Sequence, residues 1–294
     1  MAVQQLGYLI FSSADISGWR ALAEEVLGLA ASEARNDALY LKMDDRDFRI
    51  AVTPGKTERL FASGWELANR AEFNAVRETL TGENVEWRPG SAEECAFRKV
   101  KEFVWFLDPD GNRIELYWGF ISAFLPFSPP ANIDAKFMTD RIGMGHLVLP
   151  ANDLGALQAF YERMLGFGLS DTIAMQFGPG LVEVTFNHCA NTRQHSLALA
   201  EMPAPNGCVH FCLEMASLKQ VGMALDRVED AGHPLVLTLG QHVNDDCISF
   251  YFLSPQGFMI EIGYGSIHKD WDRHTVFETT RPSHWGHRFV LNVE

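Results

Sequence analysis

The feature that most constrains this chain is an internal duplication of domain size. The segment Gly7–Leu9 in the first half matches Gly145–Leu147 in the second, and Asp108–Leu116 matches Ser254–Ile262. Repeats of this kind predict copies of one architecture packed together. The 294 residues are enough for two domains, each with its own hydrophobic core.

Each half divides again into two units, and each unit has a short apolar strand, an amphipathic helix and then several strands. In the first unit the strand is expected at 7–11, and apolar residues between 22 and 27 give the next helix one buried face. Asp15 or Ser17 is the expected N-cap of that helix. Further strands are expected at 41–43, 48–52, 114–118 and 145–149, and further helices at 72–80, 153–164 and 217–231.

This pattern predicts an α+β fold of four βαβββ modules in two tandem domains, residues 1–135 and 136–294. The segment 120–141 contains three prolines and is expected to connect the halves rather than form another helix. Two modules side by side would form a curved sheet around a cavity. Side chains on the opening strands and on a closing strand would point into that cavity.

Composition excludes several kinds of partner. The formal net charge of −14 is unfavourable for binding nucleic acid or an anionic membrane surface. No apolar run approaches the roughly 20 residues that span a bilayer, and the first residues lack the basic start of a signal peptide. The five cysteines are odd in number and scattered, so we expect no disulfide framework and a cytoplasmic location. We also expect a homo-oligomer.

The histidines distinguish the two halves, because all ten lie after residue 145. His146 and His210 lie at matching positions on two expected opening strands, and Glu261 lies on a closing strand. The first half retains Glu115 but has Tyr8 and a Trp65–Glu66 stretch in place of the histidines. A lone strand histidine is usually a core residue, whereas two imidazoles and a carboxylate on one face are typical of a facial metal triad. The pattern predicts one metal site, in the second half. Ligand identity alone leaves both Fe(II) and zinc open.

Several segments resemble the two-domain extradiol ring-cleaving dioxygenases of the vicinal-oxygen-chelate (glyoxalase-like) superfamily, most closely 2,3-dihydroxybiphenyl 1,2-dioxygenase and its relatives. The resemblance lies in 143–171, 186–189, 194–197, 239–245 and 249–264, with weaker similarity at 49–52 and 285–287. It implies meta cleavage of an aryl- or alkyl-substituted catechol with insertion of O₂. It also implies Fe(II) as the cofactor, with Mn(II) as the alternative metal, bound by His146, His210 and Glu261.

The resemblance further implies that His195, His242 and Tyr251 are catalytic and that Asn244 and Asp245 support them. Histidine suits the management of protons because it titrates near neutral pH. Without the resemblance, His195 would be interpreted as a surface histidine, Tyr251 as a core residue and 244–245 as a turn. The other histidines, among them His188, His233, His268, His274, His284 and His287, are expected to be structural or to lie at the surface.

The substrate pocket is expected to be apolar and lined by parts of 175–179, Phe186 and the aromatic run near 250. Asp246 and Cys247 depart from the family pattern beside His242, which puts the fine detail there in doubt. Cys208 and Cys212 flank His210, but small buried hydrophobic residues are a more common role for such cysteines than zinc ligands. Two alternatives stay open: a metal-dependent lyase or transferase of the glyoxalase kind, and a protein that binds aromatics without turnover.

Overall fold

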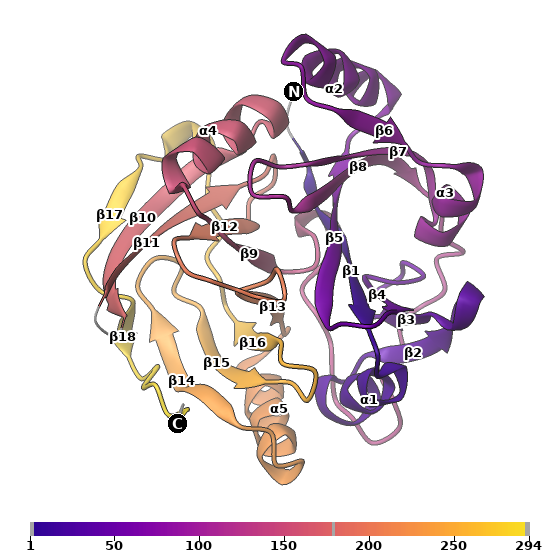
Figure 1. Cartoon of the computed structure of the whole chain (residues 1–294). Helices are drawn as coiled ribbons and strands as arrows, with labels where there is room; N and C mark the ends of the chain where they lie inside the picture. Colours follow the sequence, from indigo (N-terminus) through magenta and orange to yellow (C-terminus); the bar gives the residue numbers. More distant parts are fainter. Residues whose placement is uncertain (1–2, 178–179, 292–294) are drawn as a thin grey trace.

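The computed structural model describes residues 3–177 and 180–291 and contains two β-sheets, one from each half of the sequence (Figure 1). The strand order is β2-β3-β4-β1-β5-β8-β7-β6 in the first sheet and β17-β10-β11-β12-β9-β13-β16-β15-β14-β18 in the second. Each half contains two βαβββ modules whose opening strands pair antiparallel, β1 with β5 and β9 with β13. The predicted α+β class and module pattern are confirmed.

The first half contains β1 (Gln5–Ser13), α1 (Ile16–Ala21), η1 (Leu22–Leu27), β2 (Ala30–Glu33), η2 (Arg35–Asp37), β3 (Leu39–Lys42), β4 (Ile50–Pro54), β5 (Arg59–Leu67), α2 (Arg70–Gly82), β6 (Trp87–Pro89), α3 (Ala92–Arg98), β7 (Val100–Leu107) and β8 (Arg113–Phe120). The second half contains η3 (Asp140–Ile142), β9 (His146–Pro150), α4 (Leu154–Leu165), β10 (Gly168–Phe177), β11 (Gly180–His188), β12 (Leu197–Ala200), β13 (His210–Glu214), α5 (Leu218–Asp230), β14 (Leu235–His242), β15 (Ile248–Leu253) and β16 (Met259–Tyr264). The tail after β16 adds η4 (Trp271–Arg273), β17 (Phe277–Thr279) and β18 (Ser283–Trp285).

The first helix of each module begins at a polar N-cap, which explains why the helix starts could be predicted. The side chains of Asp15, Asn69, Asp153 and Ser217 each accept a hydrogen bond from a backbone N–H in the first turn. Where the sequence left Asp15 and Ser17 open as caps of the first helix, the structure selects Asp15. The expected strands at 41–43 and 48–52 are present as β3 and β4, each displaced by one or two residues.

Helix α3 was not predicted, although its start has a readable signal. Ser91 and Glu94 form a capping box in which each side chain accepts a hydrogen bond from the other residue's backbone N–H. The helix is short, and its last residue, Arg98, is buried beneath the first sheet. This buried arginine forms an ion pair with Glu115.

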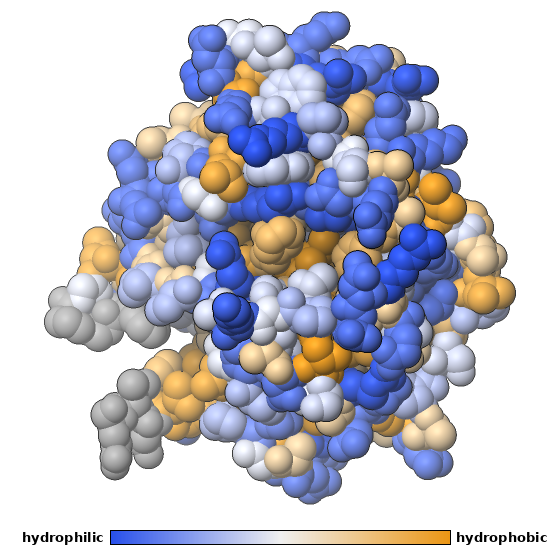
Figure 2. Space-filling model, turned by 45° about the vertical axis from the view of Figure 1, so that its right-hand side comes forward, coloured by the Kyte–Doolittle hydropathy of each residue, from blue (hydrophilic) through white to orange (hydrophobic). Residues whose placement is uncertain are grey.

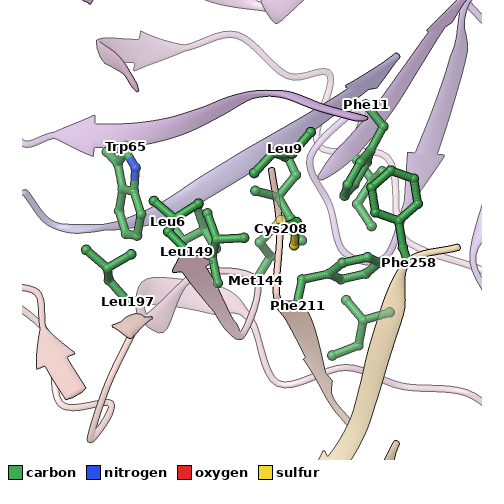
Figure 3. Close-up of a cluster of buried hydrophobic side chains, with 14 of the residues drawn as sticks. Leu6, Leu9, Phe11, Trp65, Met144, Leu149, Leu197, Cys208, Phe211 and Phe258 are labelled. Carbon is green, nitrogen blue, oxygen red and sulfur yellow. The ribbon is translucent and has the colours of Figure 1, made fainter. Parts of the chain in front are cut away.

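The two halves pack through one continuous hydrophobic core between the sheets (Figure 3). Phe11 of β1 contacts Phe211 and Phe258 of the second half, with ring centroids 5.3 and 4.7 Å apart. Trp65 of β5 packs edge-on against Phe167 at 5.0 Å. Complete burial of such a side chain contributes about 1.5–3 kcal/mol, so this interface holds the two sheets together.

The faces turned away from this shared core differ between the halves. In the first half that face is filled by aromatic side chains, including Tyr8, Phe48 and Tyr117, and the cavity there is only about 20 Å³. In the second half the corresponding face surrounds a cavity of about 330 Å³. Of these two corresponding faces, the one in the half that carries the histidines is the one with space for a ligand.

In the described ranges no helix is long and apolar enough to span a bilayer. The face in Figure 2 is mainly hydrophilic, with apolar residues in separate small groups.

Candidate metal centre

Three neighbouring strands bring the predicted ligands to one point. His146 on β9 lies opposite Cys212 on β13, and Glu261 on β16 lies opposite the same residue. His210 is two residues before Cys212, and side chains two residues apart in a strand share a face. The register of β9, β13 and β16 therefore directs both imidazoles and the carboxylate into the 330 Å³ cavity.

The three donor atoms are spaced as ligands of one ion would be. The Nε2 atom of His146 lies 3.0 Å from Glu261 Oε2 and 3.2 Å from His210 Nε2, and His210 Nε2 lies 3.4 Å from Glu261 Oε2. Ligands about 2.1 Å from a metal and at right angles to each other are about 3 Å apart. Among the described residues neither oxygen of the buried Glu261 has a hydrogen-bond partner of normal geometry. The residues fit a divalent cation, which would satisfy both oxygens.

The charges of the ligands also suit a cation. Burial by itself would raise the pKa of Glu261, but the facing imidazoles of His146, His210 and His242 hold it well below the usual value. Burial lowers the pKa of His146. An ionised carboxylate and a neutral imidazole are the forms that bind a metal.

Cys212 lies in the same cluster, although it was not predicted as a ligand. The donor atoms of His146, Cys212 and Glu261 lie within 4.8 Å of one another. Burial, together with the nearby Glu261, raises the pKa of the Cys212 thiol well above its usual value. A protonated thiol is a poor metal ligand, so we retain His210 as the third ligand. Cys208 lies in the core between the halves (Figure 3), so it does not share this face.

The three predicted catalytic side chains line the same cavity. The ring of His195 lies 4.2 Å from that of His146, centroid to centroid, and burial lowers its pKa well below the usual value. Nδ1 of His242 donates to the carbonyl of Pro282 at 3.1 Å. In the neutral imidazole Nε2 therefore accepts, and the hydroxyl of Tyr251 donates to it at 2.8 Å. His195 is buried, so its interpretation as a surface histidine is wrong.

Asn244 and Asp245 also line the cavity and are buried. Asp245 Oδ1 accepts a hydrogen bond from the backbone N–H of Cys247 at 3.0 Å, and burial raises the pKa of Asp245 to about 6. Among the described residues the side-chain nitrogen of Asn244 has no hydrogen-bond partner of normal geometry, but it lies near enough to the carboxylate of Asp171 to favour that group's charged form. Cys247 itself packs beside Gly263, and Asp246 is exposed, so neither departure from the family pattern lines the cavity.

The aromatic run near 250 lines the cavity only in part. Tyr251 faces the cavity, whereas Phe250 and Phe252 belong to the core between the halves. Side chains of successive strand residues point to opposite faces, so the expected contribution of both phenylalanines to the pocket is wrong. Met175 and Phe186 line the cavity as expected, and residues 178–179 of the expected segment lie outside the described residues.

The corresponding position in the first half holds a buried ion-pair cluster. Glu115 lies opposite Gly64 just as Glu261 lies opposite Cys212. Its carboxylate accepts hydrogen bonds from Tyr8 at 2.7 Å, from Arg98 at 2.5 and 2.6 Å and from Arg113 at 2.8 Å. Two arginines therefore occupy the electrostatic role that a cation has in the second half.

The strand register also corrects one correspondence drawn from the sequence. Tyr8 pairs with Gly64 and Ile10 with Ala62, as His146 pairs with Cys212 and Val148 with His210. The counterpart of His210 is therefore Ala62, and the expected Trp65–Glu66 stretch is wrong.

Functional residues that the sequence did not identify come mainly from the tail. Thr279, Pro282, Ser283 and His287 line the cavity, and the His287 ring lies 4.1 Å from that of His242. Gly286 permits this approach: its φ is +70°, and a Cβ there would lie 2.1 Å from the carbonyl oxygen of Leu239. The segment 285–287 belonged to the family resemblance, but nothing local indicated that it reaches the cavity.

Comparison with known proteins agrees with this geometry. The family model described as dihydroxybiphenyl dioxygenase BphC D1 matches residues 6–55. The model of the glyoxalase/bleomycin resistance protein/dioxygenase superfamily matches residues 143–262. An iron-dependent extradiol dioxygenase of Rhodococcus jostii is 37% identical over 304 aligned positions, which cover 100% of both chains.

Two further relatives extend this comparison. A 3-methylcatechol 2,3-dioxygenase of Pseudomonas putida is 37% identical and covers 98% of this chain and 99% of its own. The crystal structure of BphC, a halotolerant catechol dioxygenase, has a TM-score of 0.90 and 32% identity and covers 98% of this chain and 95% of that one.

The chain belongs to the extradiol ring-cleaving dioxygenases, within the vicinal-oxygen-chelate superfamily. Members of this family are enzymes that open catechol rings, and the R. jostii relative is iron-dependent by name. The predicted family, fold class and enzyme class are thereby confirmed. This favours ring cleavage over the lyase and the non-catalytic alternatives.

Proposed function

We propose that the cavity in the second half is the active site of an Fe(II)-dependent dioxygenase that opens a substituted catechol with O₂. His146, His210 and Glu261 bind the metal, with Mn(II) as the alternative ion. The observation that carries this assignment is the convergence of three donor atoms, 3.0–3.4 Å apart, two from imidazoles and one from a buried carboxylate. Among the residues that the structure describes, this carboxylate has no hydrogen-bond partner of normal geometry. The first domain, residues 1–135, binds no metal because arginines neutralise Glu115.

When bound, the metal supplies open positions at which the catechol oxygens and O₂ come together and exchange electrons. The side chains around it manage protons. A catechol must lose protons to bind through both oxygens, and His195 is the group that accepts and later returns one. His195 lies beside His146 and is shielded from solvent, so a proton on it stays at the reacting centre.

His242 and Tyr251, which line the same cavity, hold the two catecholic oxygens. Their mutual hydrogen bond of 2.8 Å sets the two polar atoms in a fixed geometry, and His242 Nε2 lies 3.5 Å from Glu261 Oε1. The hydroxyl of Tyr251, which donates to His242, leaves its oxygen to accept a hydrogen bond from a catechol hydroxyl. Asn244 and Asp245 also line the cavity and support these groups.

The walls beyond the polar end favour a catechol with an apolar substituent. They are formed by aliphatic and methionine side chains: Val148, Ile173, Met175, Val182, Val184, Ala198, Ala200, Met202, Val209, Val236, Leu237 and Met259. A volume of about 330 Å³ falls in the range of pockets that enclose ligands larger than a single ring. A substrate class that includes methyl- and aryl-catechols also agrees with the names of the relatives.

The decisive experiment loads the metal-free protein with Fe(II) under anaerobic conditions, then adds a diol and air. O₂ uptake and a visible product band are followed for catechol, 3-methylcatechol and 2,3-dihydroxybiphenyl. We expect one O₂ per diol and a higher kcat/KM for the substituted compounds. Absence of O₂ uptake with all three diols would refute the proposed function. We further propose a cytoplasmic homo-oligomer without nucleic-acid partners.

A further inference from the structure

We propose that Asp171 and Gln194 are positioning residues that fix His195 in the tautomer with its proton on Nδ1. The lone pair of Nε2 is then left for the cavity. The catalytic use of this tautomer rests on the proposed function of His195, whereas the tautomer itself follows from hydrogen bonding alone. None of the three residues forms part of the metal triad.

The carboxylate of Asp171, on β10, is buried and accepts hydrogen bonds from two side chains. Its Oδ1 accepts a hydrogen bond from Nε2 of Gln194 at 2.8 Å, and its Oδ2 accepts one from the hydroxyl of Thr279 at 3.0 Å. Asp171 has no exposed surface. Burial raises the pKa of Asp171, and the bonds from Gln194 and Thr279 oppose that effect by stabilising the charged form. A carboxylate that receives two donors can only accept, so it determines which end of the Gln194 amide faces it.

Gln194 is also completely buried. Its amide has a nitrogen that donates and an oxygen that accepts. Because the nitrogen faces Asp171, the oxygen faces His195, and Oε1 lies 2.6 Å from His195 Nδ1. An amide oxygen cannot donate, so Nδ1 must carry the proton. Asp245 Oδ2 lies 3.9 Å from the same nitrogen, too far to replace this hydrogen bond.

The orientation of Gln194 also determines what the other ring nitrogen of His195, Nε2, can do. A neutral imidazole protonated on Nδ1 has an accepting Nε2. His195 lines the cavity beside His146, where a base must accept a proton from a bound diol. The opposite tautomer would present an N–H to the diol and could not accept. The relay from Asp171 through Gln194 thus prepares His195 as a base before substrate arrives.

Neutral His242 also carries its proton on Nδ1, but a backbone carbonyl and not a side chain fixes this tautomer. Nδ1 of His242 donates to the backbone carbonyl of Pro282, which no side-chain substitution removes. Thr279 and Pro282 both belong to the tail, so the tail contributes to the orientation of both histidines. The direction of the hydrogen bond between Gln194 and Asp171, in contrast, can be reversed by substitution of these side chains.

The test begins with the tautomer itself, read by nitrogen NMR of metal-free protein labelled with ¹⁵N-histidine. The signals of His195 are those that disappear in His195→Asn. We expect the wild type to carry its proton on Nδ1. In Asp171→Asn the introduced amide can donate to Gln194, so the Gln194 amide turns and the proton of His195 moves to Nε2. A wild-type proton on Nε2, or an unchanged tautomer in Asp171→Asn, would overturn the proposal.

Activity provides the second readout, on iron-loaded protein. Asp171→Asn should lower kcat by about 10²-fold, the low end for loss of a general acid–base group, while iron content and KM stay within about threefold. A structural defect predicts the same loss, so the deciding variant is the double substitution Asp171→Asn with Gln194→Glu. Here the introduced amide donates to the introduced carboxylate, whose second oxygen again accepts from Nδ1. The net charge of the pair is unchanged.

We expect the double variant to restore the proton to Nδ1. Its kcat should be at least tenfold higher than that of Asp171→Asn. A double variant as impaired as the single one, or more so, would contradict the proposal. A wild-type protein without ring-cleaving activity would refute the proposed function alone, because the NMR measurement decides the tautomer independently.

Discussion

Glu115 and Glu261 occupy the same register position in the two sheets, opposite Gly64 and Cys212, but face opposite kinds of partner. Glu115 is bound by Arg98 and Arg113, whereas Glu261 faces three imidazoles and has no hydrogen-bond partner of normal geometry among the described residues. The charge of Glu115 is neutralised by two arginines, whereas Glu261 is placed to bind a cation. Substitutions at the two carboxylates and at the groups around them can separate these roles.

Substitution of the proposed ligands should abolish metal binding without unfolding the protein. Glu261→Gln, His146→Ala and His210→Ala should each lose Fe(II) and turnover, because each removes one of three donor atoms from a buried site. Iron per chain and O₂ uptake are measured on the same sample, with circular dichroism as the test of folding. His233→Ala, outside the cavity lining, is the matched control and should behave as wild type. Full iron and full activity in any of the three ligand variants would refute its assignment.

Glu115→Gln should lower the stability of the protein without affecting metal binding. Iron content and kcat should be nearly unchanged, but the free energy of unfolding should fall by about 3 kcal/mol, because Arg98 remains buried without a charged partner. Urea denaturation measures the stability, and iron analysis measures the metal. Loss of iron in this variant would place the metal in the first half and overturn the assignment of the site.

His195→Asn should separate proton management from metal binding. The variant should retain Fe(II) and bind catechols with little change in affinity, while kcat falls by roughly 10²–10⁴, as expected for loss of a general acid–base group. Steady-state O₂ uptake with iron counted in the same sample measures this. A kcat near that of wild type would show that His195 has no part in the reaction, and loss of iron would show a role in metal binding.

His287→Ala should impair the reaction through His242. The His287 ring stacks on His242 and is held by Ser283 Oγ at 2.7 Å and by the carbonyl of Ser249 at 3.0 Å. Removing it frees His242 to move, so kcat should fall by about 10–100-fold with iron retained, as for other supporting residues of metal sites. His284→Ala, an exposed tail histidine, is the control. Equal activity of the two variants would argue against a supporting role for His287.

Ala200→Phe should reveal where the substituent of the substrate lies. Ala200 lines the apolar part of the cavity at the end of β12. The larger side chain should lower kcat/KM for 2,3-dihydroxybiphenyl at least tenfold more than for catechol, since one ring still fits beside the ligands. Parallel assays with both diols measure the ratio. An unchanged ratio would place the substituent elsewhere in the cavity.

The module pattern could be predicted because its signals are local. Caps such as Asp153 and Ser217, the apolar periodicity of the helices and the alternation of strand residues all act within one element. The histidine asymmetry and the repeated Glu261 then indicated which half holds a metal. His146, His210 and Glu261 converge as expected because each lies on a strand whose position in the module is set by the repeat.

What only the tertiary structure decided depends on register and on contacts between distant segments. The sequence could not show that Ala62 is the counterpart of His210, because the pairing of β1 with β5 determines it. Nor could it show that Arg98 lies on Glu115, or that Thr279 binds Asp171 across 108 residues. The tautomer of His195 follows from such a contact, because the direction of a hydrogen bond is set by the partner that packing supplies.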